Sequence, residues 1–243
     1  ELDLLLAFDK HANDPRIGAV VKDMACELGT GNHMPDLLPQ LAQFELTLLD
    51  WMEEHKGAAQ YVAFANKCWP AFQHSFKFVP CYVNSRMARR GIPIACEVDI
   101  YGALSEYFAN CVSGTPVTLL DINNTVPKEM FCSADRAQKK GYSQREVFMG
   151  FHCGNTPICY LKQADMKPIA PCSFGGIGVI GIKGLDRFYR NVLLAKRYPH
   201  HAVVAFGHYG KAIFEALRML QVNEIDHNVM DRMLYENENP FSI

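Results

Sequence analysis

The segment of residues 94–111 reads IACEVDIYGALSEYFANC and decides the architecture of the chain around it. Its first three residues are apolar, and the carboxylate of Glu97 follows them directly. From Ile100 onward apolar residues recur at helical spacing, and Asp99 stands where a helix N-cap belongs. Open α/β sheets place ligand groups where a strand ends just before a helix begins. The segment therefore predicts an α/β unit with a carboxylate at a strand end.

The sequence before this segment alternates between helical and strand patterns. Apolar spacing predicts helices over residues 17–28, 37–52 and 57–69, and short apolar runs predict strands over 78–83 and 92–96. Amphipathic helices need a sheet or another helix to cover their apolar faces. The first part of the chain is therefore predicted to be an α/β domain.

The pattern changes from about Thr115, where short strands separated by polar or glycine-rich turns predominate. Strands are predicted over residues 117–120, 147–151, 177–182 and 202–206, and helices over 186–197 and 210–220. The intervening Ser113-Gly114-Thr115-Pro116 breaks the preceding helix. We therefore predict two domains, an α/β domain at 1–115 and a β-rich domain with flanking helices at 116–243.

Composition excludes several classes of protein. Hydrophobic residues make up 49% of the 243-residue chain and charged residues 21%, with a net charge of −2, which argues against disorder and against binding nucleic acid or anionic membranes. Apolar runs such as 175–182 fall short of the roughly 20 residues that cross a bilayer. The nine cysteines are an odd number without a CxxC pair, and the N-terminal residues lack a signal-peptide pattern. These features predict reduced thiols and a cytoplasmic protein.

Two carboxylates each follow an apolar strand, Glu97 after 94–96 and Asp121 after 117–120. Burying a carboxylate beside such runs is costly unless a cation or several donors meet it. The alternative is a pair of unrelated caps, with Glu97 beside its helix and Asp121 in an Asx turn with Asn123. Both interpretations remain open on the residues alone.

Histidines flank the last predicted strand, with His200 and His201 before it and His208 after it. Two carboxylates and one imidazole suit a divalent metal and leave positions open for substrate oxygens. Hydrogen-bonded structural histidines are the alternative. A third polar cluster, containing His152 and Asn155, follows the strand at 147–151; its alternative is a tight turn.

Common catalytic and nucleotide-binding motifs do not explain the chain. The run GIGVIG at 176–181 formally matches the dinucleotide fingerprint, but its apolar residues continue as one β-rich run, so a strand is predicted there. The sequence contains no Walker sequence, GxSxG elbow or HExxH helix. Nucleotide, serine-hydrolase and zinc-protease interpretations are therefore disfavoured.

Four segments together resemble the L-fucose/L-arabinose isomerase family. They are Cys96 to Tyr107, Leu119 to Asn124, Phe151 to Pro157 and His201 to His208, and the resemblance runs from roughly Leu4 to Leu220. In L-fucose isomerase the metal is held by a Glu, an Asp 24 positions later and a His that opens a late strand. Glu97, Asp121 and His201 match those places.

The resemblance implies a Rossmann-like three-layer domain followed by an antiparallel barrel-like domain, corresponding to the second and third domains of the family. It implies a Mn²⁺-dependent or other divalent-cation-dependent aldose–ketose isomerase of L-fucose, arabinose or a related sugar. The reaction would pass through a cis-enediol.

The implied metal ligands are Glu97, Asp121 and His201, with the two carboxylates also catalytic, and the implied substrate-binding residues are His152, Asn155 and His208. A homo-oligomer, trimeric or hexameric, is also implied, with no nucleic-acid or membrane partner. The alternatives are a non-catalytic sugar-binding or regulatory relative and a metal-dependent hydrolase or lyase.

Overall fold

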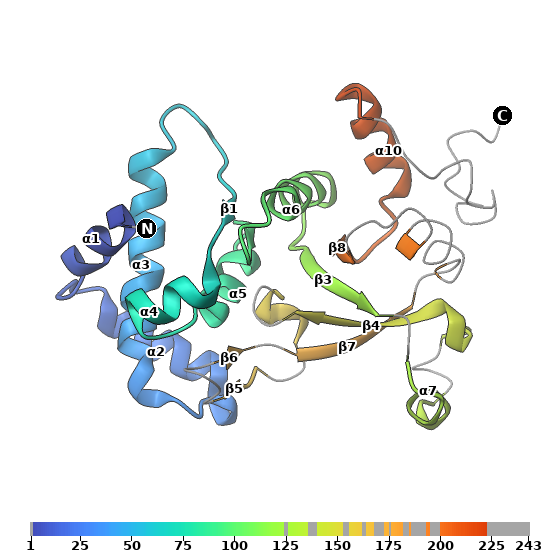
Figure 1. Ribbon diagram of the computed structural model, residues 1–243, viewed down its shortest axis with the longest axis horizontal. Coiled ribbons are helices and arrows are strands. Elements are labelled where there is room, and N and C mark those ends of the chain that lie inside the picture. Colours follow the sequence, from blue (N-terminus) through green and yellow to red (C-terminus); the bar gives the residue numbers. More distant parts are fainter. Residues whose placement is uncertain are drawn as a thin grey trace.

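A computed structural model describes residues 2–123, 126–135, 140–152, 156–161, 164–167, 173–174, 176–181, 185, 193–194 and 200–222 (Figure 1). Five α-helices form its N-terminal part: α1 (Leu2–Lys10), α2 (Ile17–Leu28), α3 (Leu38–His55), α4 (Gln73–Phe76) and α5 (Cys81–Arg89). The helices predicted over 17–28 and 37–52 are confirmed by α2 and α3. Short helical turns lie at Gly29–Gly31, Pro35–Leu37, Cys68–Phe72, Gln144–Glu146 and Ile158–Tyr160.

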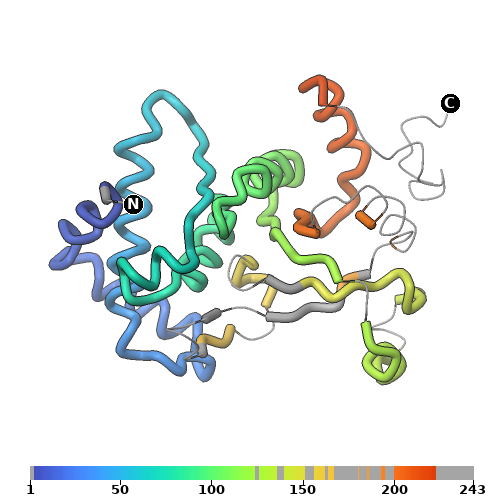
Figure 2. The backbone as a smooth tube through the Cα atoms, in the orientation of Figure 1, coloured from blue at the N-terminus to red at the C-terminus, as the bar shows by residue number. Residues whose placement is uncertain are grey.

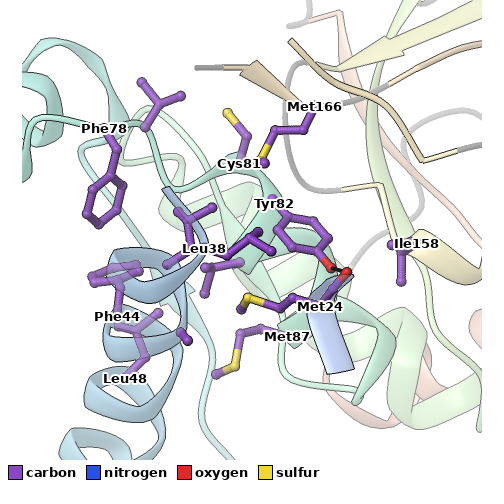
Figure 3. Packing of buried hydrophobic residues seen from close by; sticks show 14 of the residues in the cluster. Met24, Leu38, Phe44, Leu48, Phe78, Cys81, Tyr82, Met87, Ile158 and Met166 are labelled. Carbon is purple, nitrogen blue, oxygen red and sulfur yellow. Dashed lines mark hydrogen bonds between the residues drawn. The ribbon is translucent and has the colours of Figure 1, made fainter. Parts of the chain in front are cut away.

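These helices pack around one apolar core, part of which Figure 3 shows. Phe44 of α3, Tyr82 of α5 and Met24 of α2 are all almost fully buried in it. Burial of a large aromatic or aliphatic side chain contributes about 1.5–3 kcal/mol, so this core stabilises the helical part. The hydroxyl of Tyr82 donates to the carboxylate of Glu27 at 2.7 Å, which satisfies its one polar atom.

Two predictions in this part are wrong. Residues 57–63 are not helical; they lead into β1 (Phe64–Ala65), which pairs in parallel with β2 (Ile94–Ala95). The backbone amide of Phe64 donates to the carbonyl of Pro93 at 2.8 Å, a long-range bond that no local pattern reveals. The strand predicted over 78–83 is instead a loop followed by α5. A short apolar run is ambiguous between strand and buried helix.

The C-terminal part contains a four-stranded antiparallel sheet in the order β7-β4-β3-β8. Its strands are β3 (Thr118–Asn123), β4 (Val147–His152), β7 (Gly176–Gly181) and β8 (His201–Val204), which confirm the four strands predicted there. A two-stranded sheet pairs β5 (Met166–Lys167) with β6 (Ser173–Phe174), and α7 (Lys128–Ser133) lies beyond β3. Because β7 is one strand, the dinucleotide turn is absent at 176–181.

Helix α6 (Ile100–Ser113) connects the two parts, and α10 (Gly210–Met219) lies beside it (Figures 1 and 2). The buried cluster of Ala95, Ala103 and Leu119 seats α6 against β2 and β3. The helices predicted after Asp99 and over 210–220 are confirmed, whereas most of the helix predicted over 186–197 lies outside the described residues.

The chain is a mixed α/β protein, as predicted. Its four-stranded sheet is open rather than closed among the described strands, and the parallel sheet of the N-terminal part has two short strands there. Gly114, with φ of 64°, ends α6 beside the predicted division at 115/116, which stays a prediction. Among the described helices, none has both the length and the apolarity that crossing a bilayer requires.

Candidate metal site at the β3–β8 pair

The sheet register brings together two of the residues that the sequence singled out. Asp121 of β3 lies directly opposite His201 of β8 in the antiparallel pair. Opposite residues of such a pair project from the same face of the sheet. The Nε2 atom of His201 accordingly lies 3.0 Å from Oδ1 of Asp121. The two side chains form a carboxylate–imidazole pair at a partly buried position.

A second imidazole joins this pair. Nε2 of His200, the residue just before β8, lies 2.9 Å from the same Oδ1 of Asp121. The three residues have ligand atoms within 4.8 Å of one another. His200 is exposed, whereas His201 is partly buried under α6. The sequence indicates His200 as a histidine before the strand but does not place it against Asp121.

The donor atoms fit a divalent cation. Oδ1 of Asp121 is buried, yet it has no hydrogen bond of acceptable geometry in the described part of the chain, although both imidazole nitrogens are close. The imidazoles therefore crowd the oxygen without directing an N–H at it. Carboxylate oxygen and imidazole nitrogen are ligands of divalent metals such as Mn²⁺, Fe²⁺ and Zn²⁺. A cation between these atoms would satisfy the buried oxygen.

Asp99 links this group to helix α6. It is the N-cap, as predicted, and its Oδ1 accepts a hydrogen bond from the backbone amide of Gly102 at 2.7 Å. Its other oxygen, Oδ2, lies 3.3 Å from Nδ1 of His201. The cap is predictable from the local sequence, whereas this second contact is not, because the orientation of the His201 ring depends on how α6 packs on the sheet.

Glu97 lies on an unusual turn between β2 and α6. Both Glu97 and Val98 have left-handed backbone conformations, with φ of 61° and 60°. Each such non-glycine residue costs on the order of 1–3 kcal/mol, and such strain concentrates at functional sites. Asn66 holds the turn, because its carbonyl accepts from the amide of Val98 at 3.0 Å and its amide donates to the carbonyl of Ala95 at 2.9 Å. The exposed carboxylate of Glu97 is not one of the three grouped residues.

The remaining predicted site residues are placed less fully. His152 ends β4 one residue after Phe151, which lies opposite Asp121, so its backbone is near the site; its side chain lies outside what the structure describes. Asn155 lies outside the described residues. His208 is exposed in the bend between β8 and α10 and is not one of the three grouped residues.

Parts of the chain are similar to known proteins. The model of the L-fucose isomerase C-terminal domain matches residues 153–227, which include β7, β8 and α10. A sulfoquinovose isomerase of Clostridium sp. (strain MSTE9) is 31% identical over 103 residues, covering 42% of this chain and 19% of that protein. One of Priestia aryabhattai is 26% identical over 117 residues, covering 47% of this chain and 25% of that protein.

The matched region thus spans about a fifth to a quarter of the curated relatives' length. No solved structure matches the chain. The domain match and the sulfoquinovose isomerase relatives together support, at low identity, the family predicted from the sequence, which is that of L-fucose isomerase.

Proposed function

We propose that this chain carries the metal-binding part of an aldose–ketose isomerase. The observation that carries the proposal is the contact of 3.0 Å between Oδ1 of Asp121 and Nε2 of His201, across strands that are far apart in the sequence. The family match and the isomerase relatives support the same reaction class. A cation bound here would locate the reaction at the β3–β8 strand pair.

Glu97, Asp121 and His201 are the proposed ligands of Mn²⁺ or a similar divalent ion, and His200 offers a further nitrogen close to Asp121. The bound ion supplies Lewis acidity, which polarises the sugar carbonyl and stabilises negative charge on the neighbouring oxygens. The strained turn at Glu97 supports its role as a ligand, since non-glycine residues with left-handed backbone conformations occur mostly at active sites and ligand-binding sites.

The two carboxylates have a second proposed role. A free carboxylate, with a pKa of about 4, is too weak a base to remove a proton from an unactivated carbon. Once the carbonyl is polarised, Glu97 and Asp121 move protons between C1, C2 and the sugar oxygens through a cis-enediol. His152, Asn155 and His208 are proposed to contact the sugar hydroxyls.

The proposed substrate is L-fucose, arabinose or a related sugar, and the names of the relatives add sulfoquinovose to the sugars worth testing. We also propose a cytoplasmic homo-oligomer, trimeric or hexameric. Its finer architecture is proposed to follow the family, with a Rossmann-like domain and a barrel-like domain.

The test uses the complete protein, stripped of metal with a chelator and assayed against these aldoses with and without added Mn²⁺. Glu97→Gln is expected to abolish isomerisation without unfolding the protein, because an amide is not a base and is a poor ligand for a hard cation. Glu54→Gln, at an exposed position of α3, is the matched control and should leave turnover unchanged. Near-normal turnover of Glu97→Gln would refute the role of Glu97.

Two further outcomes separate the alternatives. Sugar binding without turnover of any aldose would favour the non-catalytic relative. Exchange of the transferred hydrogen with solvent deuterium would support the enediol, whereas complete retention would favour a hydride shift.

A further inference from the structure

We propose that Asp99 is a positioning residue that fixes the imidazole of His201 so that Nε2 stays beside Oδ1 of Asp121 at the proposed cation site. This inference rests on the proposed cation site and deepens it. The carboxylate of Asp99 uses one oxygen for the amide of Gly102 and the other for Nδ1 of His201. A chain of contacts therefore runs from the start of α6 through Asp99 and His201 to Asp121.

The chemistry of these atoms sets the orientation of the ring. An ionised carboxylate only accepts hydrogen bonds, so the atom of His201 facing Asp99 must be an N–H donor. In the neutral imidazole this leaves the lone pair on Nε2, the atom that lies 3.0 Å from Oδ1 of Asp121. Carboxylates bound to the outer nitrogen of a metal-ligating histidine hold its tautomer and ring orientation in this way.

Gly102 makes this arrangement sterically possible. A Cβ atom added at Gly102 would lie 2.7 Å from Cγ of Asp99 and 2.8 Å from Cδ2 of Leu119, too close for either contact. Leu119 is buried against Ala103 of the same helix, so the sheet side of α6 has little room to move. The glycine therefore lets α6 approach β3 closely enough for Asp99 to reach His201.

An N-cap alone would explain only half of the contacts of Asp99. Serine is as good an N-cap as aspartate, but its side chain is shorter. Asp99→Ser therefore keeps an acceptor for the amide of Gly102 while removing the group that meets His201. Asp99→Asn keeps both the cap and the reach, and is the conservative variant.

The experiment measures Mn²⁺ affinity by calorimetry and thermal stability on the complete protein. Asp99→Ser is expected to weaken Mn²⁺ binding about 10–100-fold, as loss of such a partner typically does, with a melting temperature close to that of the wild type. Asp99→Asn should restore much of the affinity, and Asp36→Ser, at an exposed acid, is the control. Unchanged affinity in Asp99→Ser would overturn the proposal and leave Asp99 as a cap only.

A second readout requires no metal. Crystal structures should show Nε2 of His201 beside Oδ1 of Asp121 in the wild type and the ring rotated away from that position in Asp99→Ser. If wild type binds no divalent ion, the proposed function fails, while the ring orientation still decides the role of Asp99. If Asp99→Ser does not fold, Asp99→Thr, another short capping residue that does not reach His201, takes its place, and an unchanged ring and affinity there would refute positioning in favour of capping.

Discussion

Arg86 on α5 is buried among carboxylates, and replacing it by Met is expected to destabilise the N-terminal helices by about 3–5 kcal/mol, as breaking a buried ion pair does. The guanidinium contacts Glu45 and Glu27 at 2.5 Å each and Asp23 at 2.7 Å. Glu45 is 0% exposed, and after the substitution its remaining ion-pair partner in the described residues is Arg90, at 2.5 Å. The cost therefore comes mainly from a carboxylate left in the core with half of its charge compensation.

The double variant Glu45→Met with Arg86→Met separates this cause from simple loss of packing. Removing both buried charges leaves methionines that fit an apolar environment, and exchange of a buried pair for apolar residues is often close to neutral. We expect the double variant to be more stable than Arg86→Met alone. Arg218→Met on α10, which removes an exposed pair with Glu215, should cost less than about 1 kcal/mol.

Urea unfolding of the complete protein, followed by far-ultraviolet circular dichroism, provides the measurement. The midpoint should fall in Arg86→Met with little change in the slope of unfolding free energy against urea. A loss below about 1 kcal/mol would refute the reasoning, since a broken buried pair costs several times that. A double variant that loses the sum of the two single losses would also refute it, because the two side chains would then be independent.

Two further predictions concern stability. Both ring nitrogens of His11 face acceptors, the carbonyl of Ala7 at 2.8 Å and the carboxylate of Asp50 at 2.9 Å, and although burial lowers its pKa, these hydrogen bonds raise it above the usual 6.5. Protonated His11 therefore stabilises the fold below about pH 6.5, and this stabilisation is lost as the pH rises through the folded-state pKa. The difference in melting temperature between wild type and His11→Gln should accordingly shrink from pH 5 to pH 8. A difference that grows over this range would contradict the prediction. Val98→Gly should raise the free energy of unfolding by about 1 kcal/mol, because glycine adopts the left-handed conformation of residue 98 without strain and this gain exceeds its entropic cost. Val98→Ala should not raise it, because alanine keeps a Cβ atom. Equal urea midpoints for the two variants would exclude relief of strain as the cause.

Much of the fold follows from local patterns in the sequence. The apolar stripe of 37–52 and the cap at Asp99 identify α3 and α6, because amphipathic spacing and capping act within a few residues. The segment misread at 57–69 depends on a distant partner. Phe64 is in a strand because its amide bonds to Pro93, and nothing in 57–69 shows that partner.

The candidate site was predictable only in part. The resemblance selected Asp121 and His201, and the structure brings them together through the register of two strands that are distant in sequence. Local patterns do not determine that register. The contact of His200 with Asp121 depends on the orientation of the His200 ring. The contact of Asp99 with His201 depends on how α6 packs on the sheet, which the sequence does not show. The placement of Glu97 relative to the ion stays a prediction.

The position of β8 has a consequence for how the protein holds its metal. In the described sheet β8 is one of the two edge strands and pairs there with β3 alone, so it can open without breaking a second strand pair. An ion bound by both Asp121 and His201 would cross-link the edge strand β8 to its neighbour β3. At a free concentration of one hundred times the dissociation constant such a ligand adds about 2.7 kcal/mol against opening. The free metal concentration would then determine the fraction of molecules in which β8 remains paired with β3.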